Sequence, residues 1–347
     1  MPATGRRKSA FDLVRIEDGS AVQRCVEVAL VGTALVFWRA LAEPFQLPKF
    51  TILVLAALVG LVLVVLRRAG LGWVELPPRA VLVALGLFLV GLVVAVVTSS
   101  KVATSFVGSY GVYAGLATYV AAAVLALAAA SAYDEPAADR FLGVASVVAV
   151  LAGLYALLQW AGGDPFTWLQ ETTVFATFGN ANFAAGWLGS SLPLILGWTW
   201  RHRDDQRSAL AGLAGVAVVA AAILATRSFQ GLPAAIVGVG VWAVILVLPE
   251  RAQIGARVRE LPARARQGAV AAAAVVVVAV GVFAVKLPHG LSQGLIERRF
   301  FWRAALDVFR DHPLVGSGLD TFGNQFFPHR AAEHAVRYGN SSAEELP

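Results

Sequence analysis

The sequence contains very little cysteine and no recognisable metal-ligand pattern. Cys25 is the only cysteine among 347 residues, so no disulfide bond can form within the chain. No CxxC pair and no HExxH pair occurs. These absences exclude a disulfide-stabilised scaffold and the common zinc-site classes, and the sequence predicts no metal ion or other cofactor.

Charged residues are also scarce. They make up 14% of the chain, whereas a soluble domain carries roughly 25%. Hydrophobic residues reach 58%. This balance excludes an ordinary soluble domain and predicts an integral membrane protein.

Apolar runs of the length needed to cross a bilayer, about 20 residues, recur along the chain. Such runs satisfy their backbone hydrogen bonds as helices, because the bilayer core contains no water. The predicted fold is therefore all-α, a polytopic transmembrane helical bundle of about nine spans. The first run is the weakest, since it contains Glu27 and Arg39. The nine predicted spans are residues 21–42, 50–66, 81–98, 113–132, 141–161, 183–200, 208–225, 232–248 and 269–285.

Lysine and arginine are distributed unequally between alternate loops. One set of loops carries nearly all of them, and the positive-inside rule assigns that set to the cytoplasm. We therefore expect residues 1–20 to form a cytoplasmic tail, residues 21–285 a transmembrane domain, and residues 286–347 an external loop with an amphipathic helix. The net charge of +6 is then explained by membrane anchoring, and no nucleic-acid partner is expected.

The external loop begins with a cationic, aromatic segment, "ERRFFWRAALDVFRDHPLVGSGLDTF". Apolar residues recur at helical spacing over residues 293–311, and three arginines, Arg299, Arg303 and Arg310, share another face. Pro313 predicts the end of the helix, and Gly316 and Gly318 a tight turn. Two interpretations are open: an interfacial helix in the headgroup layer, or a clamp in which guanidinium groups bind a phosphorylated, lipid-borne substrate.

This segment resembles the arginine, tryptophan, Asp-x-Pro, Gly-x-Gly and phenylalanine signature of the O-antigen ligase and O-antigen polymerase superfamily. The stretch "FATFGNANFAAGWLGSSLPLILG" is similar to that family's Thr-x-Gly-Asn-x-Asn loop, which leads into a helix. The stretches "EPFQLPKF" and "VGSYGVYAGLATY" are similar to other parts of it. Together these motifs follow the family order and extend over most of the chain.

The resemblance implies an activity at the outer face of the cell membrane, a bacterial inner membrane. Enzymes of this family transfer a glycan from a polyprenyl (undecaprenyl) diphosphate carrier in the lipid bilayer to an acceptor hydroxyl on a glycan or lipid, without a metal ion. Arginines hold the diphosphate, and Arg298, four residues before Trp302, occupies the place of the family's arginine. The substrate-binding residues implied here are Arg298, Arg299, Arg303, Arg227, Asn180 and Asn182.

The chain departs from the family pattern at two places. After the seventh predicted span the family shows Thr-x-Ser-Arg, whereas this chain reads Thr226-Arg227-Ser228-Phe229. The family's catalytic His-Asn pair lies beyond the region that ends at Pro347, so we expect a C-terminally truncated form and assign no catalytic residue. The four tail histidines, which we interpret as polar loop residues, are His289, His312, His329 and His334.

Three alternatives remain open at the level of sequence. The family resemblance does not separate a ligase from a polymerase, or an active enzyme from an inactive relative. A polytopic transporter or channel for a small or lipid-linked solute is a further class. Transporters place ionisable groups deep within their spans, and the middles of the later spans here are almost free of them.

Overall fold

The computed structural model describes residues 19–71, 76–168, 174–247 and 288–338. Within these ranges the chain forms helices and loops and contains no strand, as predicted for an all-α protein. Residues 1–18 of the predicted tail, which runs from residue 1 to 20, and the ninth predicted span, residues 269–285, lie outside the described residues. The chain divides into two compact units: residues 1–144 with 304–347, and residues 145–303.

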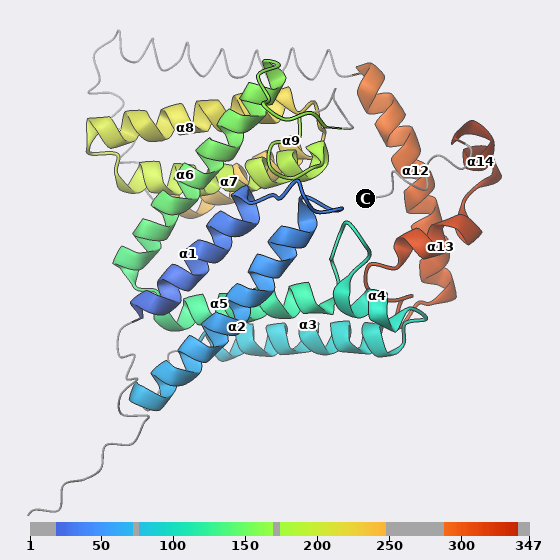
Figure 1. Cartoon of the computed structure of the whole chain (residues 1–347), viewed down its shortest axis with the longest axis horizontal. Helices are drawn as coiled ribbons and strands as arrows, with labels where there is room; N and C mark the ends of the chain where they lie inside the picture. Colours follow the sequence, from blue (N-terminus) through green and yellow to red (C-terminus); the bar gives the residue numbers. More distant parts are fainter. Residues whose placement is uncertain (1–18, 72–75, 169–173, 248–287, 339–347) are drawn as a thin grey trace, which may run out of the picture. The chain divides into compact units, whose positions relative to one another are not determined.

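In the first unit, α1 (Ser20–Leu35), α2 (Gln46–Leu71) and α5 (Leu116–Ala132) pack against one another (Figure 1). Their shared core consists mainly of small side chains, which let helix backbones approach closely. Two further helices, α3 (Arg79–Val97) and the short α4 (Val102–Val107), pack against α5. The buried core residues are Ala29, Ala56, Ala57, Ala121 and Leu125.

In the second unit, α7 (Ala181–Arg201) packs against both α8 (Gln206–Ala225) and α9 (Gly231–Trp242), as Figure 1 shows. Helix α9 continues into a short π-helical turn, η2 (Ala243–Val247). Glycine makes the α7–α9 contact possible, because a Cβ atom on Gly189 would lie 2.5 Å from the carbonyl oxygen of Gly231. Helix α6 (Glu135–Trp160) contributes most of its length to this unit.

Four helices within the described ranges are long and apolar enough to cross a membrane: α2, α3, α6 and α8. Two more, α5 and the segment that begins at α9, are apolar but shorter. Eight of the nine predicted spans overlap helices, but the described part of the chain offers four full-length candidates, so the predicted count of about nine is not confirmed. The protein is therefore a membrane protein by the length and composition of its helices.

The first predicted span, residues 21–42, begins where α1 begins but extends too far. Helix α1 ends at Leu35 instead of residue 42, and Val36 is already extended. The physical reason is Lys49, whose buried Nζ atom donates to the carbonyl oxygens of Thr33 at 2.8 Å and Ala34 at 3.2 Å. A cation at a helix C-terminus satisfies carbonyls that have no partner within the helix.

The C-terminal segment contains three helices: α12 (Pro288–Asp311), α13 (Phe322–His329) and α14 (Ala332–Tyr338). Helix α12 ends directly before His312-Pro313, as predicted. Gly316 and Gly318 adopt positive φ angles of 68° and 117°, which confirms the predicted glycine turn. The helices α13 and α14 were not predicted.

Candidate functional site

The loop before α7 is organised by Asn180. Gly179 has a φ angle of 72°, and this left-handed turn brings Asn180 to the N-cap position of α7. The Asn180 side-chain oxygen accepts a hydrogen bond of 2.8 Å from the backbone N–H of Asn182. Asn180 therefore caps the helix, while its neighbour Asn182 has its own side chain available for a different contact.

The side chain of Asn182 connects this loop to the turn between α8 and α9. Its Oδ1 atom accepts a hydrogen bond of 2.7 Å from the hydroxyl group of Ser228. Arg227 directly precedes Ser228 and has a φ angle of 53°, an uncommon conformation for a residue other than glycine. The structure thus brings three predicted site residues, Asn180, Asn182 and Arg227, into two segments joined by one hydrogen bond; we call these residues and Ser228 the α7–α9 junction.

Local hydrogen bonds hold the turn that carries Arg227. Thr226 donates to the carbonyl oxygen of Ile223 at 2.7 Å and accepts from the N–H of Ser228 at 3.2 Å. The Ser228 hydroxyl also accepts from the N–H of Gln230 at 3.2 Å. Thr226 and Ser228 are buried, whereas the Arg227 side chain between them is exposed. The turn therefore presents a single guanidinium group outward.

Ser228 is a site residue that sequence reasoning missed. The sequence feature that could have indicated Ser228 is the order Thr226-Arg227-Ser228, in which two hydroxyl residues flank the arginine. The structure shows that this serine is the residue that contacts Asn182.

The other three predicted site residues lie on α12, and they are not on one face. At 3.6 residues per turn, Arg299 and Arg303 are about 40° apart around the helix axis, whereas Arg298 lies about 100° from Arg299. Arg299 and Arg303 are exposed and Arg298 is half-buried. Among the described residues, no hydrogen bond or ion pair joins Arg298, Arg299 or Arg303 to the α7–α9 junction.

The segment after α12 contacts the loop between α3 and α5. One carboxylate oxygen of Asp320 accepts from the N–H of Ser109 at 2.6 Å, the hydroxyl of Ser109 at 2.9 Å and the N–H of Ala114 at 3.3 Å. The Ser99 hydroxyl donates to the carbonyl oxygen of Ser317 at 3.2 Å. The C-terminal segment therefore lies against the end of α3, and we call this set of contacts the Asp320 tether.

Two tail histidines have structural roles, so their interpretation as polar loop residues was wrong. His329, at the end of α13, forms an ion pair of 2.8 Å with Asp311. The hydrogen bond to Asp311 raises the pKa of His329 above its usual value. His334 lies in α14, is buried, and packs edge-on against the ring of Phe326.

The loop after α6 is organised by Asp164. Its carboxylate accepts hydrogen bonds from the Tyr155 hydroxyl, the Gln159 amide, the Trp168 indole and the N–H of Phe166. Desolvation raises the pKa of Asp164, but these hydrogen bonds together outweigh it and leave the pKa below its usual value. The carboxylate is therefore ionised, and its hydrogen bonds stabilise the loop.

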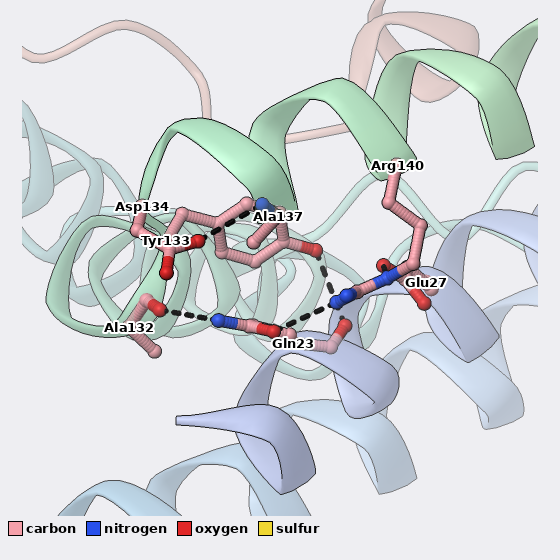
Figure 2. Close-up of polar contacts among 7 residues, drawn as sticks. All are labelled: Gln23, Glu27, Ala132, Tyr133, Asp134, Ala137 and Arg140. Atoms are coloured by element: carbon pink, nitrogen blue, oxygen red, sulfur yellow. Dashed lines mark hydrogen bonds and ion pairs between the residues drawn. The ribbon is translucent and has the colours of Figure 1, made fainter. Parts of the chain in front are cut away.

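A polar network joins α1 to the turn between α5 and α6 (Figure 2). Arg140 donates to the Glu27 carboxylate at 2.8 Å and to the Gln23 side-chain oxygen at 2.7 Å, while Gln23 donates to the carbonyl of Ala132 at 2.7 Å. The Tyr133 hydroxyl donates to the Gln23 carbonyl at 3.1 Å, and burial raises the pKa of Tyr133 to about 12. Glu27, the charge that weakened the first predicted span, is thus paired.

Metal-binding groups of three or more acidic, cysteine or histidine residues do not occur in the described part of the chain. The predicted site residues are arginines and asparagines, and hydroxyl groups accompany them at the α7–α9 junction. Such groups bind phosphate and sugar oxygens by hydrogen bonding and need no metal ion to do so. Within the described ranges, the α7–α9 junction and α12 are therefore the two candidate substrate-binding elements.

No family model, curated protein or solved structure matches the chain. The resemblance to the O-antigen ligase and polymerase superfamily stays a prediction.

Proposed function

We propose that this membrane protein transfers a glycan from a polyprenyl diphosphate carrier to an acceptor hydroxyl at the outer face of the cell membrane. The observation that supports this most is the α7–α9 junction. Asn180, Asn182 and Arg227 were predicted from two loops more than forty residues apart, and the Asn182–Ser228 hydrogen bond of 2.7 Å joins those loops. An arginine and two amides carried by two hydrogen-bonded segments suit an anionic, sugar-bearing ligand.

The reaction is a nucleophilic displacement at the anomeric carbon. The oxygen of the acceptor hydroxyl forms a bond to that carbon, and the bond from the carbon to the diphosphate oxygen breaks. The polyprenyl diphosphate leaves with the electron pair, and a general base takes the hydroxyl proton. Arginine side chains stabilise the charge that develops on the departing diphosphate, because a guanidinium group donates two parallel hydrogen bonds to phosphate oxygens.

The distribution of charge in the spanning helices supports chemistry at the membrane boundary over a path through the membrane. In α2 the charged residues are Lys49, Arg67 and Arg68, all near the helix ends, and α3 has only Arg79 at its first position. In α6 the charges lie in the first two turns, and α8 has one arginine at its second position. Ionisable groups in the middle of spans mark most transport pathways, and these four helices have none.

The Asp320 tether supports placing the C-terminal segment on the same side of the membrane as the loop between α3 and α5. Asp320 and Ser317 contact that loop directly. Both segments were predicted to be external on the basis of the arginine distribution, and a contact between them agrees with that topology.

The experiment that tests the proposal uses the purified full-length protein in proteoliposomes with an undecaprenyl diphosphate-linked oligosaccharide and an acceptor glycan. We expect polyprenyl diphosphate to be released in equal amount to the glycan transferred, and chelation of divalent metal ions to leave the rate unchanged. Movement of the intact lipid-linked oligosaccharide across the bilayer, with no cleavage of its diphosphate bond, would instead assign the protein to the transporter class.

A further inference from the structure

Helix α12 has two apolar faces on opposite sides. Phe300, Ala304 and Val308 recur every fourth residue and are buried. On the opposite side, Trp302, Leu306 and Phe309 are 60%, 56% and 59% exposed. At 3.6 residues per turn, the centres of the two faces are about 170° apart. One face is therefore packed against protein, while the other presents three large apolar side chains outward.

Arginines flank the exposed apolar face. Arg299, Arg303 and Arg310 form a row along one edge, and Arg298 lies beyond the other edge. Arg310 forms an exposed ion pair of 2.8 Å with Asp307, whereas Arg299 and Arg303 have no hydrogen-bond or ion-pair partner among the described residues. A stripe that combines tryptophan, leucine and phenylalanine with arginines on both edges fits the boundary between acyl chains and phosphate groups.

The end of α12 is held near the end of a membrane-spanning helix. Helix α3 ends at Val97, and two residues later Ser99 donates to the carbonyl of Ser317 at 3.2 Å. A Cβ atom on Gly318 would lie 2.1 Å from the Ser99 hydroxyl, so the two segments are in close contact. The chain takes six residue-to-residue steps from Asp311 to Ser317, which span at most about 21 Å. The C-terminal end of α12 is therefore within about 21 Å of the contact that Ser317 makes beside the end of α3.

We propose that the face of α12 formed by Trp302, Leu306 and Phe309 docks onto the surface of the lipid bilayer, with Arg299, Arg303 and Arg310 bound to anionic phospholipid phosphates. The helix lies in the plane of the membrane, because its arginines prevent it from crossing the hydrocarbon core. The charge complements an anionic surface and the apolar stripe enters the acyl boundary. This docking is independent of glycan transfer, and it fixes how Arg298 is presented whatever reaction the protein performs.

The depth of spin labels on α12 in the membrane tests this proposal. The single native cysteine allows a Cys25→Ala background in which one nitroxide label is attached at Leu306, Phe309 or Asp307. In nanodiscs, labels at Leu306 and Phe309 should collide more with oxygen than with a water-soluble nickel chelate. The Asp307 label is the matched control, about 100° around the helix from Leu306, and should show the reverse. Equal nickel accessibility at all three positions would overturn the proposal.

Varying the charge of the lipid separates the contribution of the arginines to docking from that of the apolar side chains. Phosphatidylglycerol added to phosphatidylcholine nanodiscs should shift the Leu306 label deeper, and the variant with Arg303→Gln and Arg310→Gln should lose this shift. A shift that persists in the double variant would overturn the assignment of phosphate binding to the arginines. Dipolar broadening between Leu306 labels on two copies in one nanodisc would show that a second copy covers this face, and would also overturn the proposal.

Discussion

Among individual residues, the side chains of the α7–α9 junction have separable roles. Asn180 caps α7 through its contact with the N–H of Asn182, so Asn180→Ala should destabilise the protein by about 1 kcal/mol. Asn182 and Ser228 share one hydrogen bond, so their alanine variants should be non-additive in a double-mutant cycle, by about 1 kcal/mol. Thermal unfolding in detergent measures all three changes.

The same variants address the proposed donor site. If Asn180 and Asn182 bind the donor, the double alanine variant should lose more donor affinity than stability. A loss of stability that accounts for the whole change in binding would leave only the capping role. The Ser228→Ala variant is the sharper probe, because it alters the position of Arg227 without removing any group that was predicted to touch the donor.

A pH-dependent contact is expected at His329. The ion pair with Asp311 raises the folded-state pKa of His329, so the pair stabilises the fold at pH values below the unfolded-state pKa. This stabilisation is lost as the pH rises through the raised folded-state pKa. His329→Gln should therefore be less stable than the wild type in mildly acidic solution, with a difference that shrinks as the pH rises. A difference that is constant across this range would contradict the protonated pair.

At the scale of helices, two glycines on α7 make a matched pair. A Cβ atom on Gly189 would lie 2.5 Å from the Gly231 carbonyl oxygen, whereas one on Gly186 would meet nothing within 4 Å. Gly186→Ala should stabilise the helix by up to about 1 kcal/mol, because alanine has the higher helix propensity. Gly189→Ala should destabilise the protein, since the α7–α9 packing must open. Equal effects of the two changes on the thermal unfolding temperature would contradict the packing described here.

Helix periodicity was the part of the structure that the sequence predicted best. The buried residues Phe300, Ala304 and Val308 share the predicted spacing, and α12 ends where Pro313 predicted. The end of α1 was not predictable in the same way, because it depends on Lys49, more than ten residues further along the chain. Likewise, the Asp320 tether joins residues about 210 positions apart, and no local pattern reports such a contact.

In the candidate site, the sequence did not predict which residues contact one another. The sequence selected Asn182 and Arg227 from separate loops, but the hydrogen bond that joins these loops is made by Ser228. The three arginines of α12 were predicted to act together, whereas the helical geometry separates Arg298 from Arg299 and Arg303. A linear motif does not show this separation, because neighbours in sequence lie about 100° apart on a helix.

For the whole molecule, the predicted orientation is the condition on which the proposed function depends. Reporter fusions at Ala263 should be cytoplasmic and those at Asn340 external, because arginine-rich loops remain on the cytoplasmic side. The opposite pattern would place Arg227 and the α12 arginines on the wrong side of the membrane for a donor that has been moved to the outer leaflet.

The measurement that tests the central claim most directly is glycan transfer by the Arg298→Lys variant of the full-length protein, recorded beside its membrane insertion. Lysine keeps the charge but lacks the planar pair of donors that a diphosphate requires, so we expect normal insertion and loss of transfer. Arg310→Lys is the matched control, since Arg310 lies on the same helix, is paired with Asp307, and should tolerate the change. Full transfer activity in Arg298→Lys would contradict the claim that this arginine binds the diphosphate of the donor.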